Sequence, residues 1–185
     1  MTTTWSIGLH SWIIQDGNYP DFMVGDQCRF ALEFDAKHVV LTGSQRRYWE
    51  HISGARYKFV GDVVFINDKV WVIDFGLQAY TEARSPQFIQ LGARVEGELY
   101  LGVDPFTYKE NLWSIPGMPS LIRDFRIESI SLETTPWIPG YIGASGARIR
   151  DDSRESFVEV PRTDAWQDDD QHAHYVLRCE LLSGG

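Results

Sequence analysis

Apolar and polar residues alternate with a period of two along much of this chain, which is typical of β-strands that bury one face. The alternation is clear in residues 28–34, 92–103 and 175–181, where charged side chains separate the apolar ones. In the last of these segments it places Cys179 on the inward face. We therefore predict a strand in each segment, and Asp104-Pro105 should end the second one.

Helix signals are weak by comparison. No long segment repeats apolar residues at the 3.6-residue period of an amphipathic helix. Short helices are expected only in residues 45–52 and 107–113, whereas residues 5–14 have the character of a strand. Most of the ordered chain should therefore be β-structure.

The strongest local pattern is a β-hairpin centred on Asn67 and Asp68. Residues 61–66 and 69–76 are rich in β-branched and aromatic side chains, and these two residues separate them. Asn and Asp tolerate the left-handed backbone of a tight hairpin turn. Both strands are apolar on both faces, which predicts a central position covered on two sides.

The alternation shifts by one position in residues 125–132. Phe125 and Ile127 continue one register, whereas Ile130 and Leu132 carry the apolar side chains of the other. One extra residue in a strand produces such a shift, so we predict a β-bulge near Ser129.

These patterns predict an all-β fold with little helix. About seven short strands separated by turns are typical of a compact barrel, here partly open and of the oligonucleotide/oligosaccharide-binding (OB) type, or of a two-sheet sandwich. The length of 185 residues fits one domain over residues 1–185. Residues 137–171 form a long excursion, in which only residues 157–160 have strand character.

Composition and charge indicate which partners suit this fold. The chain contains seven Trp, eight Tyr and ten Phe residues, more rings than a small core requires, so some rings should contact a partner. Its formal net charge of −9 disfavours nucleic acids and anionic membranes and favours basic partners. Residues 150–170 contain three Arg against eight Asp or Glu residues, so the excursion carries over half of the negative excess.

The sequence predicts a cytoplasmic protein without a disulfide framework. No segment has the roughly 20 consecutive apolar residues that span a bilayer, and the first residues lack the basic-then-apolar form of a signal peptide. Cys28 and Cys179 have no CxxC spacing and are expected to be ordinary core thiols.

Three aromatic residues near prolines are candidate contacts for a protein partner. They are Trp113, Trp137 and Tyr141. Proline stiffens the backbone and lowers the entropy cost of presenting a ring, although packing over the barrel ends would explain these rings equally well. The leading hypothesis is a non-enzymatic binding protein, in which a β scaffold presents these rings and the acidic excursion to a protein partner.

A short basic and aromatic segment supports an alternative function, the binding of single-stranded nucleic acid. Its residues are Arg46, Arg47, Trp49, Arg56 and Tyr57. Basic groups that follow phosphates and rings that stack on bases are the requirements of such a site. The negative net charge weakens this alternative, and a short helix with its rings packed inward would also explain the pattern.

A second alternative is a metal-dependent enzyme. Asp170, His172 and His174 are spaced by two, so on a strand they would project from the same side. Two imidazoles and a carboxylate are suitable ligands for zinc or iron. Alternatively, this polar segment is the solvated end of a loop with both histidines exposed, and the protein then needs no cofactor.

Familiar catalytic motifs are missing from the sequence, which contains no GxSxG, GxxxxGK[ST] or strand-associated GxGxxG segment. Asp74 stands in an apolar run, where burial would raise its pKa for acid or base catalysis, unless an amide or an arginine pairs with it. Glu96 and Glu98 share a strand face but are expected to face solvent. Catalysis is therefore a weaker expectation than binding.

Overall fold

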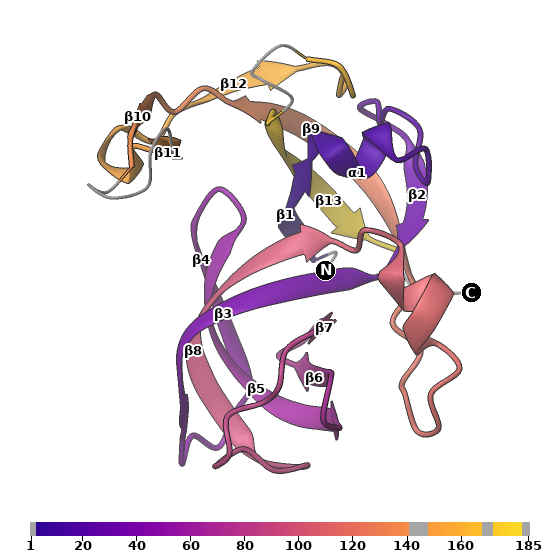
Figure 1. The fold of residues 1–185 in the computed structure, drawn as a ribbon, viewed down its shortest axis with the longest axis vertical. Coiled ribbons are helices and arrows are strands. Elements are labelled where there is room, and N and C mark those ends of the chain that lie inside the picture. The colour runs from indigo at the N-terminus through magenta and orange to yellow at the C-terminus, as the bar shows by residue number, and fades with distance from the viewer. Residues whose placement is uncertain (1–2, 141–147, 168–171, 183–185) are drawn as a thin grey trace.

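Strands dominate the computed structural model, which describes residues 3–140, 148–167 and 172–182. The fold is 51% strand and 8% helix, and five strands close a mixed β-barrel from which further strands extend (Figure 1). The all-β fold and the barrel that the alternation predicts are confirmed. The barrel is closed rather than partly open.

Five strands form the barrel: β3 (Leu32–Leu41), β5 (Arg56–Ile66), β6 (Trp71–Asp74), β7 (Gln78–Thr81) and β8 (Arg94–Val103). They pair in the order β8–β3–β7–β6–β5, and β5 pairs again with β8 to close the circle. Neighbouring strands are antiparallel except β3 and β7, which are parallel. The prediction that the strand of residues 92–103 ends before Asp104 is confirmed by the end of β8.

A second group of strands, which we call the outer sheet, continues from the barrel. Its strands are β1 (Thr4–His10), β2 (Gln27–Phe30), β9 (Arg123–Glu133), β12 (Phe157–Val160) and β13 (His174–Leu181). β1 contacts β8 in parallel, with Gly8 opposite Gly102, and pairs with β13 along its length. β9 follows β13, and its far edge carries β2 and β12. Figure 1 shows the outer sheet above the barrel.

The remaining elements are short: α1 (Ser11–Gln15), β4 (Tyr48–Ser53), the π-helical turn η1 (Tyr108–Leu112), β10 (Trp137–Pro139), β11 (Arg148–Arg150) and the 3-10 turn η2 (Asp152–Arg154). β4 pairs with β5, and β10 pairs with β11. In Figure 1 the β10–β11 pair extends to one side of the outer sheet, and the segment that connects β8 to β9 lies on the opposite side.

One continuous hydrophobic core fills the barrel and extends beneath the outer sheet. It joins the barrel side chains Phe34 and Leu99 to Trp5 of β1 and Phe125 of β9. A second cluster packs η1 against the outside of the barrel at Val72. β6 is therefore buried on both faces, which is the central position that the apolar hairpin predicts.

The hairpin between β5 and β6 is confirmed, but its turn differs from the expected one. Neither Asn67 nor Asp68 adopts a positive φ angle. Instead the Asn67 side-chain oxygen accepts hydrogen bonds from the backbone N–H groups of Lys69 and Val70, each at 2.8 Å. The Asn67 N–H donates to the carbonyl oxygen of Val70 at 2.9 Å. The side chain thus replaces the left-handed backbone as the device that closes the turn.

The predicted bulge is present one residue from the expected position. Arg178 of β13 pairs with Ser129 of β9, and the next residue, Cys179, pairs with Ile127. Glu128 is therefore the extra residue of β9. Cys179 is fully buried, in agreement with the predicted inward face of the last strand.

The helix predicted for residues 45–52 is wrong, because this segment forms strand β4 at the edge of the barrel. Tyr48 and Trp49 pair with Val60 and Phe59 of β5. Aromatic and β-branched residues fit a pleated surface well, and the neighbouring strand supplies hydrogen bonds that sequence periodicity does not reveal.

The strand predicted for residues 5–14 ends at His10, and α1 follows it. Ile13 and Ile14 are adjacent and both buried, which a helical turn permits and a strand with one buried face does not. The helix expected in residues 107–113 is confirmed as η1. Within the described part of the chain, no helix has the length and apolar character needed to cross a membrane.

Candidate functional site

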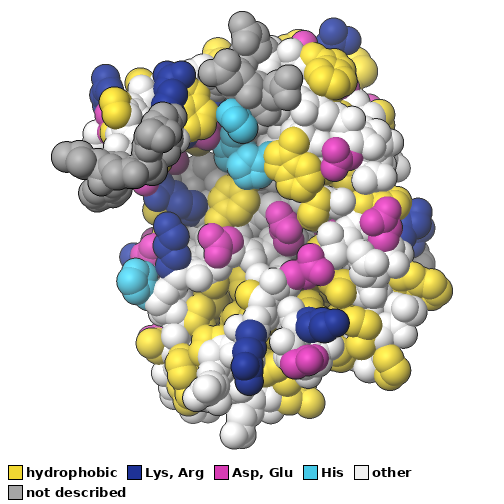
Figure 2. Space-filling view, viewed as in Figure 1, with side chains coloured by type: hydrophobic (Ala, Val, Ile, Leu, Met, Phe, Trp, Pro, Cys, Tyr) yellow, Lys and Arg dark blue, Asp and Glu magenta, His cyan; other side chains and the backbone are white. Residues whose placement is uncertain are grey.

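An open cleft of about 920 Å³ lies between the barrel and the outer sheet. The barrel strands β3 and β8 supply one wall, and β1, β9 and β13 supply the other. The β10–β11 pair and η2, both parts of the excursion, lie along its rim. Figure 2 shows the hollow, with histidines at its edge and with Lys or Arg and acidic side chains below it.

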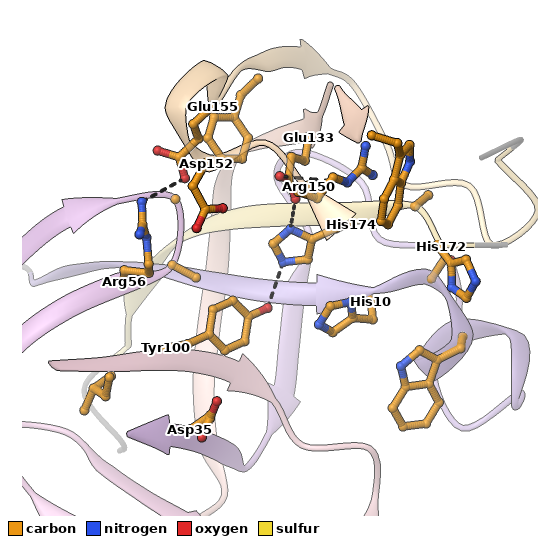
Figure 3. A pocket seen from close by; sticks show the side chains of 18 of the residues that line it. His10, Asp35, Arg56, Tyr100, Glu133, Arg150, Asp152, Glu155, His172 and His174 are labelled. Atoms are coloured by element: carbon orange, nitrogen blue, oxygen red, sulfur yellow. Dashed lines mark hydrogen bonds and ion pairs between the residues drawn. The ribbon is translucent and has the colours of Figure 1, made fainter. Parts of the chain in front are cut away.

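A row of hydrogen-bonded side chains crosses the outer sheet within the cleft (Figure 3). Tyr100 of β8 has its hydroxyl 2.7 Å from Nε2 of His174 on β13. His174 Nδ1 lies 2.8 Å from the carboxylate of Glu133 on β9. The spatial order of the strands, β8–β1–β13–β9, matches the order of these side chains, with β1 lying between Tyr100 and His174.

Glycine on β1 makes the contact between Tyr100 and His174 possible. A Cβ atom on Gly8 would lie 1.7 Å from the Tyr100 hydroxyl oxygen, so the phenol crosses β1 through the space that a side chain would fill. On β8, a Cβ atom on Gly102 would lie 3.2 Å from the Tyr100 ring and 3.4 Å from Glu33. Glycine within a strand often marks such a close approach.

The protonation of this row follows from its chemistry. Burial raises the pKa of Glu133, but hydrogen bonds from His174 and Thr135 outweigh burial and hold the pKa below its usual value. The ionised carboxylate only accepts hydrogen bonds, so His174 Nδ1 carries the proton that faces it. Nε2 of a neutral His174 is then the acceptor for the Tyr100 hydroxyl. Burial, followed by the charges of Glu33 and Glu133, raises the pKa of Tyr100, so the phenol stays protonated.

His10 lies beside this row with part of its ring open to the cleft. Its ring centroid is 4.7 Å from that of His174 and 6.1 Å from that of Tyr100. Burial of the ring, and then the charge of the nearby His174, lowers the pKa of His10 to about 4. Its imidazole is therefore neutral near pH 7.

Carboxylates dominate the wall that the barrel contributes. We call Glu33, Asp35 and Glu98 the acidic wall. Within the described residues, none of the three side chains makes an ion pair or a hydrogen bond. Burial, and then the charge of Asp104, raises the pKa of Glu33 to about 7, whereas Asp35 and Glu98 are exposed.

Trp137 is held at the rim of the cleft by cationic side chains. The Arg150 guanidinium lies 4.0 Å from the centre of the Trp137 ring, and that of Arg148 lies 5.8 Å from it. Arg150 also donates to the Thr135 carbonyl oxygen at 2.6 Å. His172 contacts the same ring edge-on, with centroids 6.3 Å apart.

The three predicted aromatic contacts do not form one surface. Trp137 lines the cleft, whereas Trp113 is 62% exposed just after η1 and takes no part in the cleft. Figure 1 shows their two segments on opposite sides of the molecule. Tyr141 lies outside the described residues.

The predicted nucleic-acid segment is engaged in contacts within the protein. Arg47 pairs with Asp74 at 2.6 Å, and Arg56 pairs with Glu155 at 3.3 Å. The rings also pack inward. Trp49 lies 4.4 Å from Trp5, centroid to centroid, and Tyr57 is 1% exposed with its hydroxyl against the Ser6 backbone. Arg46 alone among the five is exposed with no ion pair in the described chain. These contacts favour a structural role for the segment.

The predicted metal ligands are placed only in part. Asp170 lies outside the described residues, and His172 and His174 both line the cleft. Both ring nitrogens of His174 already have protein partners, Glu133 and Tyr100. Among the described residues, no three His, Cys, Asp or Glu side chains are grouped as a metal site. The metal hypothesis stays a prediction.

Asp74 has the ion-paired role that the sequence allows as its alternative. Burial raises the pKa of its carboxyl, but the Gly76 N–H and the Arg47 guanidinium outweigh burial and lower the pKa. This residue is therefore ionised and structural rather than a general acid.

Sequence reasoning did not identify Tyr100, His10 or Glu133 as site residues. They come from strands far apart in the chain. The available signal was Gly8 and Gly102, because a glycine inside a strand often marks the close approach of another group to the backbone. The chain matches no family model, and comparisons with curated proteins and with solved structures likewise find no match.

Proposed function

We propose that this protein is a binding protein that holds a basic segment of a protein partner in the cleft. The observation that carries the proposal is the negative excess of the lining. Among the described residues the lining has six Asp or Glu side chains and four Lys or Arg side chains.

Part of this negative charge has no ion-pair partner among the described residues. Glu133 is paired with His174, and Glu155 is paired with Arg56. Asp35, Glu98 and Asp152 have no such partner in the described chain, and Glu33, with its pKa raised to about 7, is only partly ionised near neutral pH. A concave surface with an excess of one sign of charge attracts a ligand of the opposite sign. Arginine and lysine side chains are the cations that a protein partner offers.

Aromatic side chains at the cleft suit the same ligand. Trp12 of α1 lines the cleft and is 43% exposed. An indole ring attracts a cation over its face and is a frequent anchor in protein interfaces. The proposal thus keeps the binding function expected from the sequence and moves its centre from the separate loops to the cleft, where Trp137 and part of the acidic excursion lie.

A peptide of six arginines tests this proposal by isothermal titration calorimetry. The double variant Asp35→Asn/Glu98→Gln should bind the peptide about 5- to 30-fold more weakly, because each exposed ion pair contributes about 0.5–1 kcal/mol. The matched control is Asp68→Asn/Glu110→Gln, which removes the same charge from exposed positions outside the cleft. The control should bind like the original protein.

Equal weakening by both double variants would mean that the peptide responds only to net charge, and this would overturn the assignment of the cleft. Absence of binding by the unaltered protein at low salt would overturn the proposed function itself.

A further inference from the structure

We infer that Tyr100 is an activated nucleophile in a triad with His174 and Glu133, and that the triad takes acyl esters as its substrate class. In this triad His174 is the general base and Glu133 is the residue that positions the base. The inference concerns chemistry at one end of the cleft and goes beyond the binding of a basic segment.

The geometry is that of a nucleophile, a base and an orienting acid. A nucleophilic side chain and its base must lie within about 2.6–3.2 Å, and a third group must orient the base. The distance from the Tyr100 hydroxyl to His174 Nε2 is 2.7 Å, and that from His174 Nδ1 to Glu133 is 2.8 Å. All three residues line the cleft.

The hydrogen-bond directions also fit this role. Glu133 fixes the proton on Nδ1, which leaves Nε2 free to accept the Tyr100 proton. The phenol stays protonated until a substrate carbonyl is attacked, as a serine hydroxyl does in a hydrolase triad. The carboxylate then stabilises the imidazolium that forms.

The proposed reaction balances with water as the only co-reactant. The Tyr100 oxygen bonds to the ester carbonyl carbon while its proton passes to His174 Nε2. The bond between that carbon and the alcohol oxygen breaks, and the alcohol leaves with the proton from His174. Water then attacks the acyl-tyrosine by the same route, which releases the carboxylic acid and restores the phenol.

The surroundings favour a neutral carbonyl over a phosphate as the group attacked. Phosphate would meet the negative charges of Asp35, which pairs with Tyr100 in the strand register, and of Glu98 on the same strand as Tyr100, whereas an ester carries no charge to repel. The developing oxyanion needs a hydrogen-bond donor, and we assign this role to the N–H of the neutral His10 ring, whose centroid lies 6.1 Å from that of Tyr100.

The test is the reaction of the purified protein with p-nitrophenyl acetate. We expect a burst of about one equivalent of p-nitrophenolate and, on peptide mass spectrometry, one acetyl group on Tyr100. Tyr100→Phe should abolish the burst. The matched control, Tyr48→Phe, removes a hydroxyl that lies outside the cleft and donates to Glu50, and it should keep the burst.

Glu133→Gln separates positioning from mere structural support. The acetylation rate of Tyr100 should fall by about 10²–10⁴-fold, whereas the affinity for the ester should change little, because the base loses the carboxylate that orients it. Circular dichroism spectra identical to that of the unaltered protein confirm that the variants are folded.

Acetylation spread over lysines with none on Tyr100, or an undiminished burst from Tyr100→Phe, would overturn the triad. The acetyl map of the unaltered protein decides this even if a variant fails to fold. The probe is small and uncharged, so its result is independent of whether the cleft binds an arginine peptide.

Discussion

At the scale of single residues, Glu33 shows how the cleft raises the pKa of a carboxyl group. It lies on the wall of an open cleft, yet burial and the charges of Asp104, Glu82 and Asp35 raise its pKa to about 7 from 4.5. Between pH 4.5 and about pH 7 the folded protein therefore keeps the Glu33 proton, whereas the unfolded chain loses it. Its contribution to stability is therefore greatest at low pH and is lost as the pH rises through about 7.

Replacing Glu33 with Gln should remove this dependence on pH. At pH 8 the variant should have a free energy of unfolding roughly 2–3 kcal/mol above that of the unaltered protein, because the neutral amide avoids burial of a charge. At pH 4.5 the two proteins should differ little, since Glu33 is then protonated when folded. Urea unfolding of both proteins at the two pH values measures the effect. An equal difference at both would contradict the shifted pKa, because the other titrating groups are common to both proteins.

At the scale of elements, the approach of β8 to β1 decides the geometry of the site. Tyr100 reaches across β1 only because Gly8 has no side chain. A methyl group there would collide with the phenol and force it away from His174. The two strands pair at one position only in the described chain, Gly8 with Gly102, so the Tyr100 side chain adds to a short contact rather than to a long hydrogen-bond ladder.

Gly8→Ala should lower the free energy of unfolding by roughly 2–4 kcal/mol, from overpacking and from the lost hydrogen bond. Gly43→Ala is the control, since nothing lies within 4 Å of the new methyl group, and it should change stability by less than about 0.5 kcal/mol. Adding Tyr100→Leu to Gly8→Ala should cost less than the sum of the two single changes, as chemical denaturation would show. Additive losses would contradict the steric explanation.

The elements also show what the sequence can and cannot predict. The alternation located β8 and β13, and the slip near Ser129 located the bulge to within one residue, because these signals are local. β4 was mistaken for a helix because its hydrogen bonds come from β5. The row from Tyr100 to Glu133 could not be predicted for the same reason, because it depends on which strands become neighbours in the folded protein.

At the scale of the whole molecule, the cleft separates a barrel from an outer sheet, and both contribute charges to it. A basic ligand would contact both walls at once and would be lost on unfolding. Binding to the folded state alone raises stability, by about 2.7 kcal/mol when the ligand is present at 100 times its dissociation constant. The net charge of −9 adds long-range attraction to these local contacts.

The hexa-arginine peptide should therefore raise the melting temperature by about 5–10 °C at that concentration, as measured by differential scanning fluorimetry in roughly 10 mM salt. The Debye length shrinks from about 30 Å at that ionic strength to about 3 Å at 1 M, so the shift should nearly vanish in 1 M sodium chloride. A hexa-glutamate peptide should produce no shift at either salt concentration, and Asp35→Asn/Glu98→Gln should reduce the shift that hexa-arginine causes. A shift that persists in 1 M salt would mean that apolar contacts, rather than the acidic wall, hold the ligand.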